Sequence, residues 1–302
     1  MVSVTWLVAT LAAACFQVAR TAMQRRLGGD MGPNAAGFVR YVFGAPVALA
    51  AVGLIALTSP PLPGISWRFV GIVSVAGLAQ ILATNLLIRS FELRDFVIGT
   101  TYSKTEAAQV ALFSAVLLGE PLPGPAWIGV GLCLTGVVLL ACRGDLGAVG
   151  RVLRARGDRA MWAGMGAAAG FGLAAVCIRA ASRSLGEDRP IVRALMTLAT
   201  MNTLQTLANG LWLVVRAPSE LEAIRRRLAH SVTVGLLSVG GSAGWAIGMT
   251  LQNAAVVRTV GQIDLVLAFV VGRFVFHEER RRSEIVASLV IVAGVVAILL
   301  TE

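Results

Sequence analysis

The chain has 302 residues, of which 57% are hydrophobic and only 14% are charged, and its mean hydropathy is +0.79. A soluble core of this size would not bury so much apolar surface, which excludes the water-soluble classes and predicts that the bilayer is the chain's solvent. The formal charge of +10 comes almost entirely from Arg in short segments between apolar runs, so it indicates membrane topology rather than nucleic-acid binding.

Ten apolar windows along the chain are long enough, or nearly so, to cross the hydrocarbon core of a bilayer, which takes roughly 20 residues of helix. Segments rich in Gly, Pro or Arg separate these windows. We therefore predict an all-α integral membrane protein with transmembrane helices near residues 3–23, 34–57, 69–90, 96–118, 125–142, 160–182, 191–215, 231–253, 258–276 and 284–301.

The two halves of the chain are related by an offset of 158 positions, which indicates an internal duplication. This single offset aligns Gly77 with Gly235, Glu106 with Asp264, Glu120 with Glu278, and Gly136 with Gly294. We predict a first five-helix repeat at 1–144, an Arg-rich connecting loop at 145–159 and a second five-helix repeat at 160–302. Because five is odd, the second copy enters the membrane from the opposite face, and the ten helices form two inverted repeats, as in many secondary transporters.

The chain resembles EamA-type members of the drug/metabolite transporter superfamily over essentially its whole length. The resemblance rests on the ten-span duplication, on Arg40 near the start of the second helix, and on the segment 117–121 (Leu-Leu-Gly-Glu-Pro), which 275–279 echoes. It implies a transporter of small metabolites, amino acids among them. Such proteins often carry Glu-Pro in the fourth and ninth helices. Here Ala107 follows Glu106 and Leu265 follows Asp264, so the proline kink is expected to be absent.

Glu106 and Asp264 are the leading candidates for solute binding or coupling. An ionised side chain in mid-membrane costs several kcal/mol, so it usually faces a partner or a wet cavity, and the inverted repeat would bring these two acids near a common axis. Because burial disfavours the charged form of a carboxyl group, coupling to protons is a reasonable hypothesis. The alternative is a purely structural ion pair, in which Lys104 reaches Asp264 across the two halves.

Two further groups of polar residues could line a cavity, although contacts between helices would also explain them. Tyr102 and Gln109 lie at i−4 and i+3 from Glu106, on one side of a continuous helix. The predicted seventh helix carries a stripe at i, i+3 and i+7, which lipid would not tolerate and which therefore points inward. The stripe consists of Asn202, Gln205 and Asn209, and Gln17 begins a similar set in the first helix.

These features favour a secondary transporter of a small polar metabolite in the cell (inner) membrane, working by alternating access in the export direction. The alternative is a lipid-carrier flippase component or an accessory membrane subunit, since either would share this architecture. We expect no cofactor, no metal and no nucleic-acid partner. An enzyme is not expected, because the chain has two His and no nucleophile motif. The partners expected are the solute, membrane lipids and, as a coupling ion, protons; the oligomeric state is left open.

Two features of the sequence predict opposite orientations of the chain in the membrane. Arg is concentrated in the odd-numbered loops, and because cytoplasmic loops are enriched in Lys and Arg, this bias predicts that both termini face outward. The family resemblance implies instead that both termini are cytoplasmic.

Overall fold

The computed structural model describes residues 2–26, 33–93, 101–142, 145–154, 158–186, 188–275 and 282–301. Glu278 and most of the 275–279 segment lie outside the described residues. Within them every regular element is helical and no strand occurs, so the all-α prediction is confirmed. In chain order the helices are α1 (Val2–Arg26), α2 (Pro33–Val42), α3 (Gly44–Thr58), α4 (Trp67–Glu92), α6 (Glu106–Leu118), α7 (Ala126–Ala141), α8 (Leu146–Arg154), α9 (Arg159–Ser184), α10 (Pro190–Arg216), α11 (Pro218–Arg226), α12 (Leu228–Leu251), α13 (Ala254–Val260), α14 (Ile263–Phe274) and α15 (Arg282–Leu299).

Seven helical segments are long and apolar enough to cross a membrane, judged among the described residues by length and composition. They are Val4–Met23, Ala35–Thr58, Trp67–Ser90, Arg159–Ser184, Leu228–Leu251, Ala254–Phe274 and Arg282–Leu299. Helix α7 is apolar but shorter. Helix α10 has 27 residues, but the amides of its polar stripe lower its hydropathy. The chain is therefore a multi-pass membrane protein, and the count of ten spans stays a prediction.

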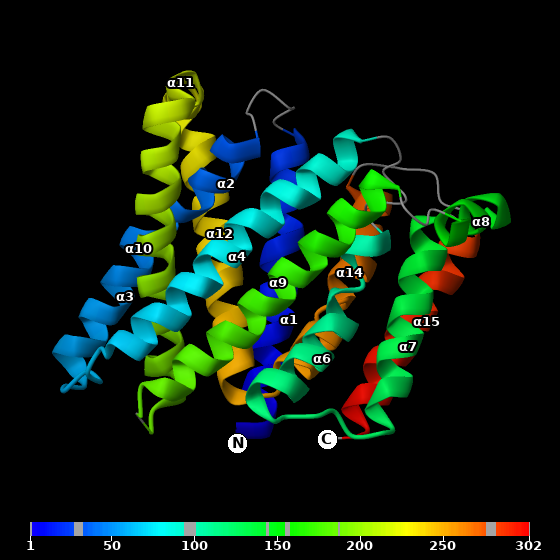
Figure 1. Ribbon diagram of the computed structural model, residues 1–302, viewed down its shortest axis with the longest axis horizontal. Helices are drawn as coiled ribbons and strands as arrows, with labels where there is room; N and C mark the ends of the chain where they lie inside the picture. Colours follow the sequence, from blue (N-terminus) through cyan, green and yellow to red (C-terminus); the bar gives the residue numbers. More distant parts are fainter. Residues whose placement is uncertain are drawn as a thin grey trace. The chain divides into compact units, whose positions relative to one another are not determined.

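The helices divide into two compact units, and each unit draws on both halves of the sequence (Figure 1). Unit 1 comprises Met1–Ile81 and Ala174–Gln252, and unit 2 comprises Leu82–Leu173 and Asn253–Glu302. Helices α4 and α9 each contribute residues to both units. Each unit therefore combines segments of the two predicted repeats, whose boundaries at 144 and 160 stay a prediction.

In unit 2, α7 and α15 pack side by side through glycines (Figure 1). A methyl group built on Gly136 would lie 2.8 Å from the backbone nitrogen of Ile291, and one built on Gly294 would lie 2.7 Å from that of Cys133. Small residues let helix backbones approach this closely where no hydrophobic effect drives their association. Residue numbers rise along one helix as they fall along the other, so the pair is antiparallel. Gly136 and Gly294 differ by 158, as do Cys133 and Ile291, so the two contacts are equivalent under the repeat offset.

Unit 1 contains a second pair of contacts that the same offset relates. Gly77 of α4 faces Met201 of α10, whose Cγ would lie 3.6 Å from a methyl group at that glycine. Gly235 of α12 faces Phe43, which joins α2 to α3, and a methyl group there would overlap the Phe43 side chain. Both the glycines and their partners are 158 positions apart. The sequence landmarks Gly77, Gly136, Gly235 and Gly294 are thus all positions of close helix contact.

The α7–α15 contact predicts that Gly136→Ala and Gly294→Ala each lower the free energy of unfolding by about 1–3 kcal/mol, because the added methyl group overpacks against backbone. Gly131→Ala, on the same α7, is the matched control, since nothing lies within 4 Å of its position. Its expected effect is neutral or slightly stabilising. The stability order of the three variants is checked by the heat-denaturation midpoint in detergent, measured as the loss of the folded gel-filtration peak with rising temperature. Equal midpoints for all three variants would contradict the close contact.

Candidate functional site

Two helical segments of unit 2 are interrupted just before an acidic residue. Residues 101–103 are helical, the chain turns at Lys104 and Thr105, and α6 begins at Glu106. In the other segment α13 ends at Val260, the chain turns at Gly261 and Gln262, and α14 begins one residue before Asp264. No proline follows either acid, yet the α-helical pattern is interrupted for two residues just before each, while Thr105, Gly261 and Gln262 keep right-handed helical backbone angles.

Hydrogen bonds between residues three apart form these turns. The backbone N–H of Lys104 donates to the carbonyl of Thr101 at 3.2 Å, and that of Gln262 donates to the carbonyl of Thr259 at 3.1 Å. Such bonds close tighter rings than the α-helical pattern. The N–H groups of a first helical turn have no partner within the helix and carry partial positive charge, so an acidic side chain there is stabilised. Glu106 occupies that position in α6 and Asp264 occupies it in α14.

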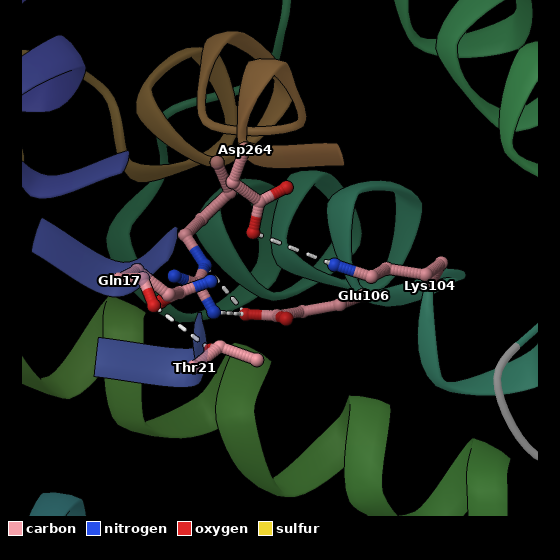
Figure 2. Close-up of polar contacts among 6 residues, drawn as sticks. Gln17, Thr21, Lys104, Glu106 and Asp264 are labelled. Atoms are coloured by element: carbon pink, nitrogen blue, oxygen red, sulfur yellow. Dashed lines mark hydrogen bonds and ion pairs between the residues drawn. The ribbon is translucent and has the colours of Figure 1, made fainter. Parts of the chain in front are cut away.

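Each of the two acids pairs with a basic side chain of the other interrupted segment (Figure 2). The guanidinium of Arg258, on α13, donates through Nε and Nη2 to Oε1 of Glu106. The Lys104 ammonium lies 3.7 Å from Oδ2 of Asp264. Glu106 is 9% exposed and Asp264 is 7% exposed, so both carboxyl groups are buried beside a cation. The ion pair between Lys104 and Asp264 is the one considered from the sequence.

Two buried polar atoms, one in the turn before Asp264 and one on the helical residues before Lys104, have no hydrogen-bond partner among the described residues. They are Oγ1 of Thr101 and Oε1 of Gln262, whose residues are 5% and 6% exposed. A buried polar atom without a partner costs about 1–3 kcal/mol. The charge cluster of Lys104, Glu106, Arg258 and Asp264 therefore has unused hydrogen-bonding capacity beside it.

Tyr102 and Gln109 are placed differently from the sequence expectation of one continuous helical face. The α-helical pattern is interrupted between Tyr102 and Glu106, so the four-residue spacing no longer places the two side chains on one helical face. The Tyr102 hydroxyl donates to the carbonyl of Val152 on α8 at 2.9 Å. Gln109 lies on α6, where its Nε2 donates to Thr105 Oγ1 at 2.9 Å.

The polar stripe of α10 lies in unit 1, and all three members are buried, with exposures of 3% for Asn202, 1% for Gln205 and 6% for Asn209. Nε2 of Gln205 donates to Oε1 of Gln80 at 2.8 Å and to the carbonyl of Gly77 at 3.2 Å. Some of the stripe therefore serves helix-to-helix hydrogen bonding. Oε1 of Gln205 has no partner among the described residues.

Gln17 is half-buried on α1, also in unit 1. Its backbone carbonyl accepts a hydrogen bond from the Thr21 hydroxyl at 2.8 Å. The predicted site residues thus fall into two sets. Lys104, Glu106, Gln109 and Asp264, with Tyr102 before the turn, belong to unit 2, and Gln17, Asn202, Gln205 and Asn209 belong to unit 1.

Sequence reasoning missed two arginines inside the membrane helices, Arg258, which is half-buried, and Arg179, which is buried. Arg258 was placed at the edge of a predicted window, but α13 begins four residues earlier, at Ala254. Arg179 of α9 is 8% exposed and donates to the carbonyls of Met249 and Gln252 at the end of α12. The signal was present in both cases, because each arginine lies one turn or more inside an apolar run rather than beyond its end.

Comparison with known proteins supplies a family and a fold. Residues 4–142 match the model of the EamA-like transporter family. A solved structure described only as "Crystal structure of protein" resembles the chain with a TM-score of 0.73 at 18% sequence identity, covering 99% of this chain and 97% of that chain. At this identity the likeness establishes the fold alone. Among curated proteins no match to the chain is found.

The ion pair predicts unequal effects for its two partners. Glu106→Gln leaves the half-buried Arg258 guanidinium without its carboxylate, so we expect the free energy of unfolding to fall by about 3–5 kcal/mol. Arg258→Gln leaves the Glu106 carboxylate in the first turn of α6, where the helix terminus stabilises a negative charge, so the expected loss is smaller. Heat-denaturation midpoints in detergent check the order, and equal losses would contradict it.

Proposed function

We propose that the chain is a secondary transporter of a small polar metabolite, such as an amino acid or an amine, because residues 4–142 match the EamA-like transporter family of the drug/metabolite transporter superfamily. The direction proposed is export across the cell (inner) membrane. Members of this family are membrane transporters rather than enzymes, and the seven apolar helical segments agree with that class.

The buried charge cluster of unit 2 carries the proposal. Burying two carboxylates, each beside a half-buried cation, is costly unless they are paired, and a well-packed apolar cluster would often serve stability as well or better. In transporters, interrupted helices supply helix ends and irregular backbone to a solute site. The coincidence of two helix interruptions with Glu106 and Asp264 supports a site that handles a polar or charged solute, and it supports protons as the coupling ion.

Alternating access is supported by the contacts that the 158-residue offset relates. The antiparallel α7–α15 pair and the equivalent contacts of Gly77 and Gly235 are what two inverted copies of one unit would produce. In such folds one part of the structure rocks against another around a central site. We propose that the ten-helix inverted repeat underlies this motion.

Reconstitution in liposomes with an imposed proton gradient tests the proposal. Pooled amino acids, amines and nucleobases are loaded inside, and the expected result is gradient-linked loss of at least one solute. In protein that elutes as a single folded species, Glu106→Gln and Asp264→Asn are expected to reduce that flux by about tenfold or more, because each removes a buried ionisable group.

Glu222→Gln is the matched control, since the side chain of this α11 residue is 45% exposed and, among the described residues, pairs with the nearby Arg225 and Arg226, and it should transport normally. Lipid scrambling without any solute flux would contradict the proposal and favour a flippase. Unchanged flux in both site variants would place the site elsewhere.

A further inference from the structure

We propose that Arg258 is a displaceable counter-ion. Its guanidinium pairs with the Glu106 carboxylate while no solute is bound, and a cationic group of the solute replaces it when the solute binds. This inference rests on the transporter function proposed above and narrows its substrate class. The solute would carry an ammonium or guanidinium group, together with an acceptor such as a carboxylate or carbonyl that can meet the released arginine.

The two members of the pair differ in how firmly they are held. Glu106 is the first residue of α6 and has a shorter side chain than Arg258, and a negative charge in the first turn of a helix is stabilised. Arg258 reaches it on a long, flexible side chain from α13. That helix has only seven residues and is bounded by non-helical residues at 252–253 and 261–262. When the pair opens, the carboxylate is therefore the fixed receptor and the cation is the part that moves.

The surroundings of the pair are those of a site rather than of a closed structural network. In a network that serves stability alone, each buried polar atom has its partner. Here Oγ1 of Thr101 and Oε1 of Gln262 are buried without one among the described residues. Gln262 lies in the turn before Asp264, at the position that the repeat offset aligns with Lys104, and Thr101 lies on the helical residues just before the other turn. Both oxygens can accept hydrogen bonds, which a bound polar solute could supply.

The remaining charges can stay paired when Arg258 is displaced. Two atoms of the guanidinium donate to one carboxylate oxygen of Glu106, so a single cationic group on the solute could reproduce the contact. Lys104 and Asp264 form a separate pair within the cluster, with 3.7 Å between nitrogen and oxygen. That pair can stay in place while Glu106 exchanges its partner, which keeps the rest of the cluster neutral.

Chemical labelling of Glu106 tests the proposal without any need for transport. Dicyclohexylcarbodiimide adds to protonated carboxyl groups and leaves a stable acylurea that mass spectrometry locates by peptide. A carboxyl group whose oxygen accepts from the Arg258 guanidinium should label slowly, because its reactive oxygen is occupied. In Arg258→Gln that guanidinium is gone, so we expect the labelling of Glu106 to rise by about tenfold or more. Arg258→Lys should label as slowly as the unmodified chain.

The displacement step is tested in Arg258→Ala, where the missing side chain leaves room for a small cation. Methylguanidinium should protect Glu106 from labelling, whereas methylurea, which is similar in shape and neutral, should not. Labelling of Asp264 reports that the rest of the cluster is intact. If Arg258→Ala does not yield folded protein, Arg258→Gln carries the same comparison.

Two results would overturn the inference. Equal labelling of Glu106 in the unmodified chain and in Arg258→Gln would show that Arg258 is not its counter-ion. Equal protection by methylguanidinium and methylurea, or by neither, would show that the site does not accept a cationic group in place of the arginine. Either result could occur in a chain that transports a solute normally, so failure of this inference is distinguishable from failure of the proposed function.

Discussion

The ion pair between Glu106 and Arg258 is the interaction on which the function argued for this chain depends. A charge removed from water must be paired, neutralised or hydrogen-bonded, and within unit 2 the structure meets that requirement with a carboxylate at a helix start and a guanidinium from a short neighbouring helix. The Lys104–Asp264 pair meets it in the same way. A cluster whose charges cancel can be buried and still exchange partners, which is the property that a solute site in lipid needs.

Much of the fold could be predicted from hydropathy. A helix that crosses lipid must form all its backbone hydrogen bonds internally and carry apolar side chains, so it stands out as a long apolar run. The repeat itself stays a prediction, but two of the glycines that mark it, Gly136 and Gly294, lie where helix backbones come close. The division into two units could not be predicted from the sequence. Hydropathy reports which residues avoid water but not which helices pack together, and both units draw on both halves of the sequence.

The candidate site was predictable in part. Glu106 and Asp264 stood out because acids are rare within apolar runs, and the structure buries both. Arg258 was missed because a boundary error of four residues placed it at a helix end, where arginines commonly reach the interface. The helix interruptions were missed because no proline marks them. Since the expected face around Glu106 assumed a continuous helix, the turn at Lys104 also moved Tyr102 away from that face and toward Val152.

The most direct test of the central claim is a charge swap at the pair, measured as thermal stability in lipid nanodiscs. Glu106→Arg and Arg258→Glu each place two like charges in one buried site, whereas the double variant restores an opposite pair in reversed order. We expect both single variants to be less thermally stable than the unmodified chain and the double variant to recover most of that stability. Such coupling is expected of residues in contact. A double variant no more stable than the worse single variant would contradict the account.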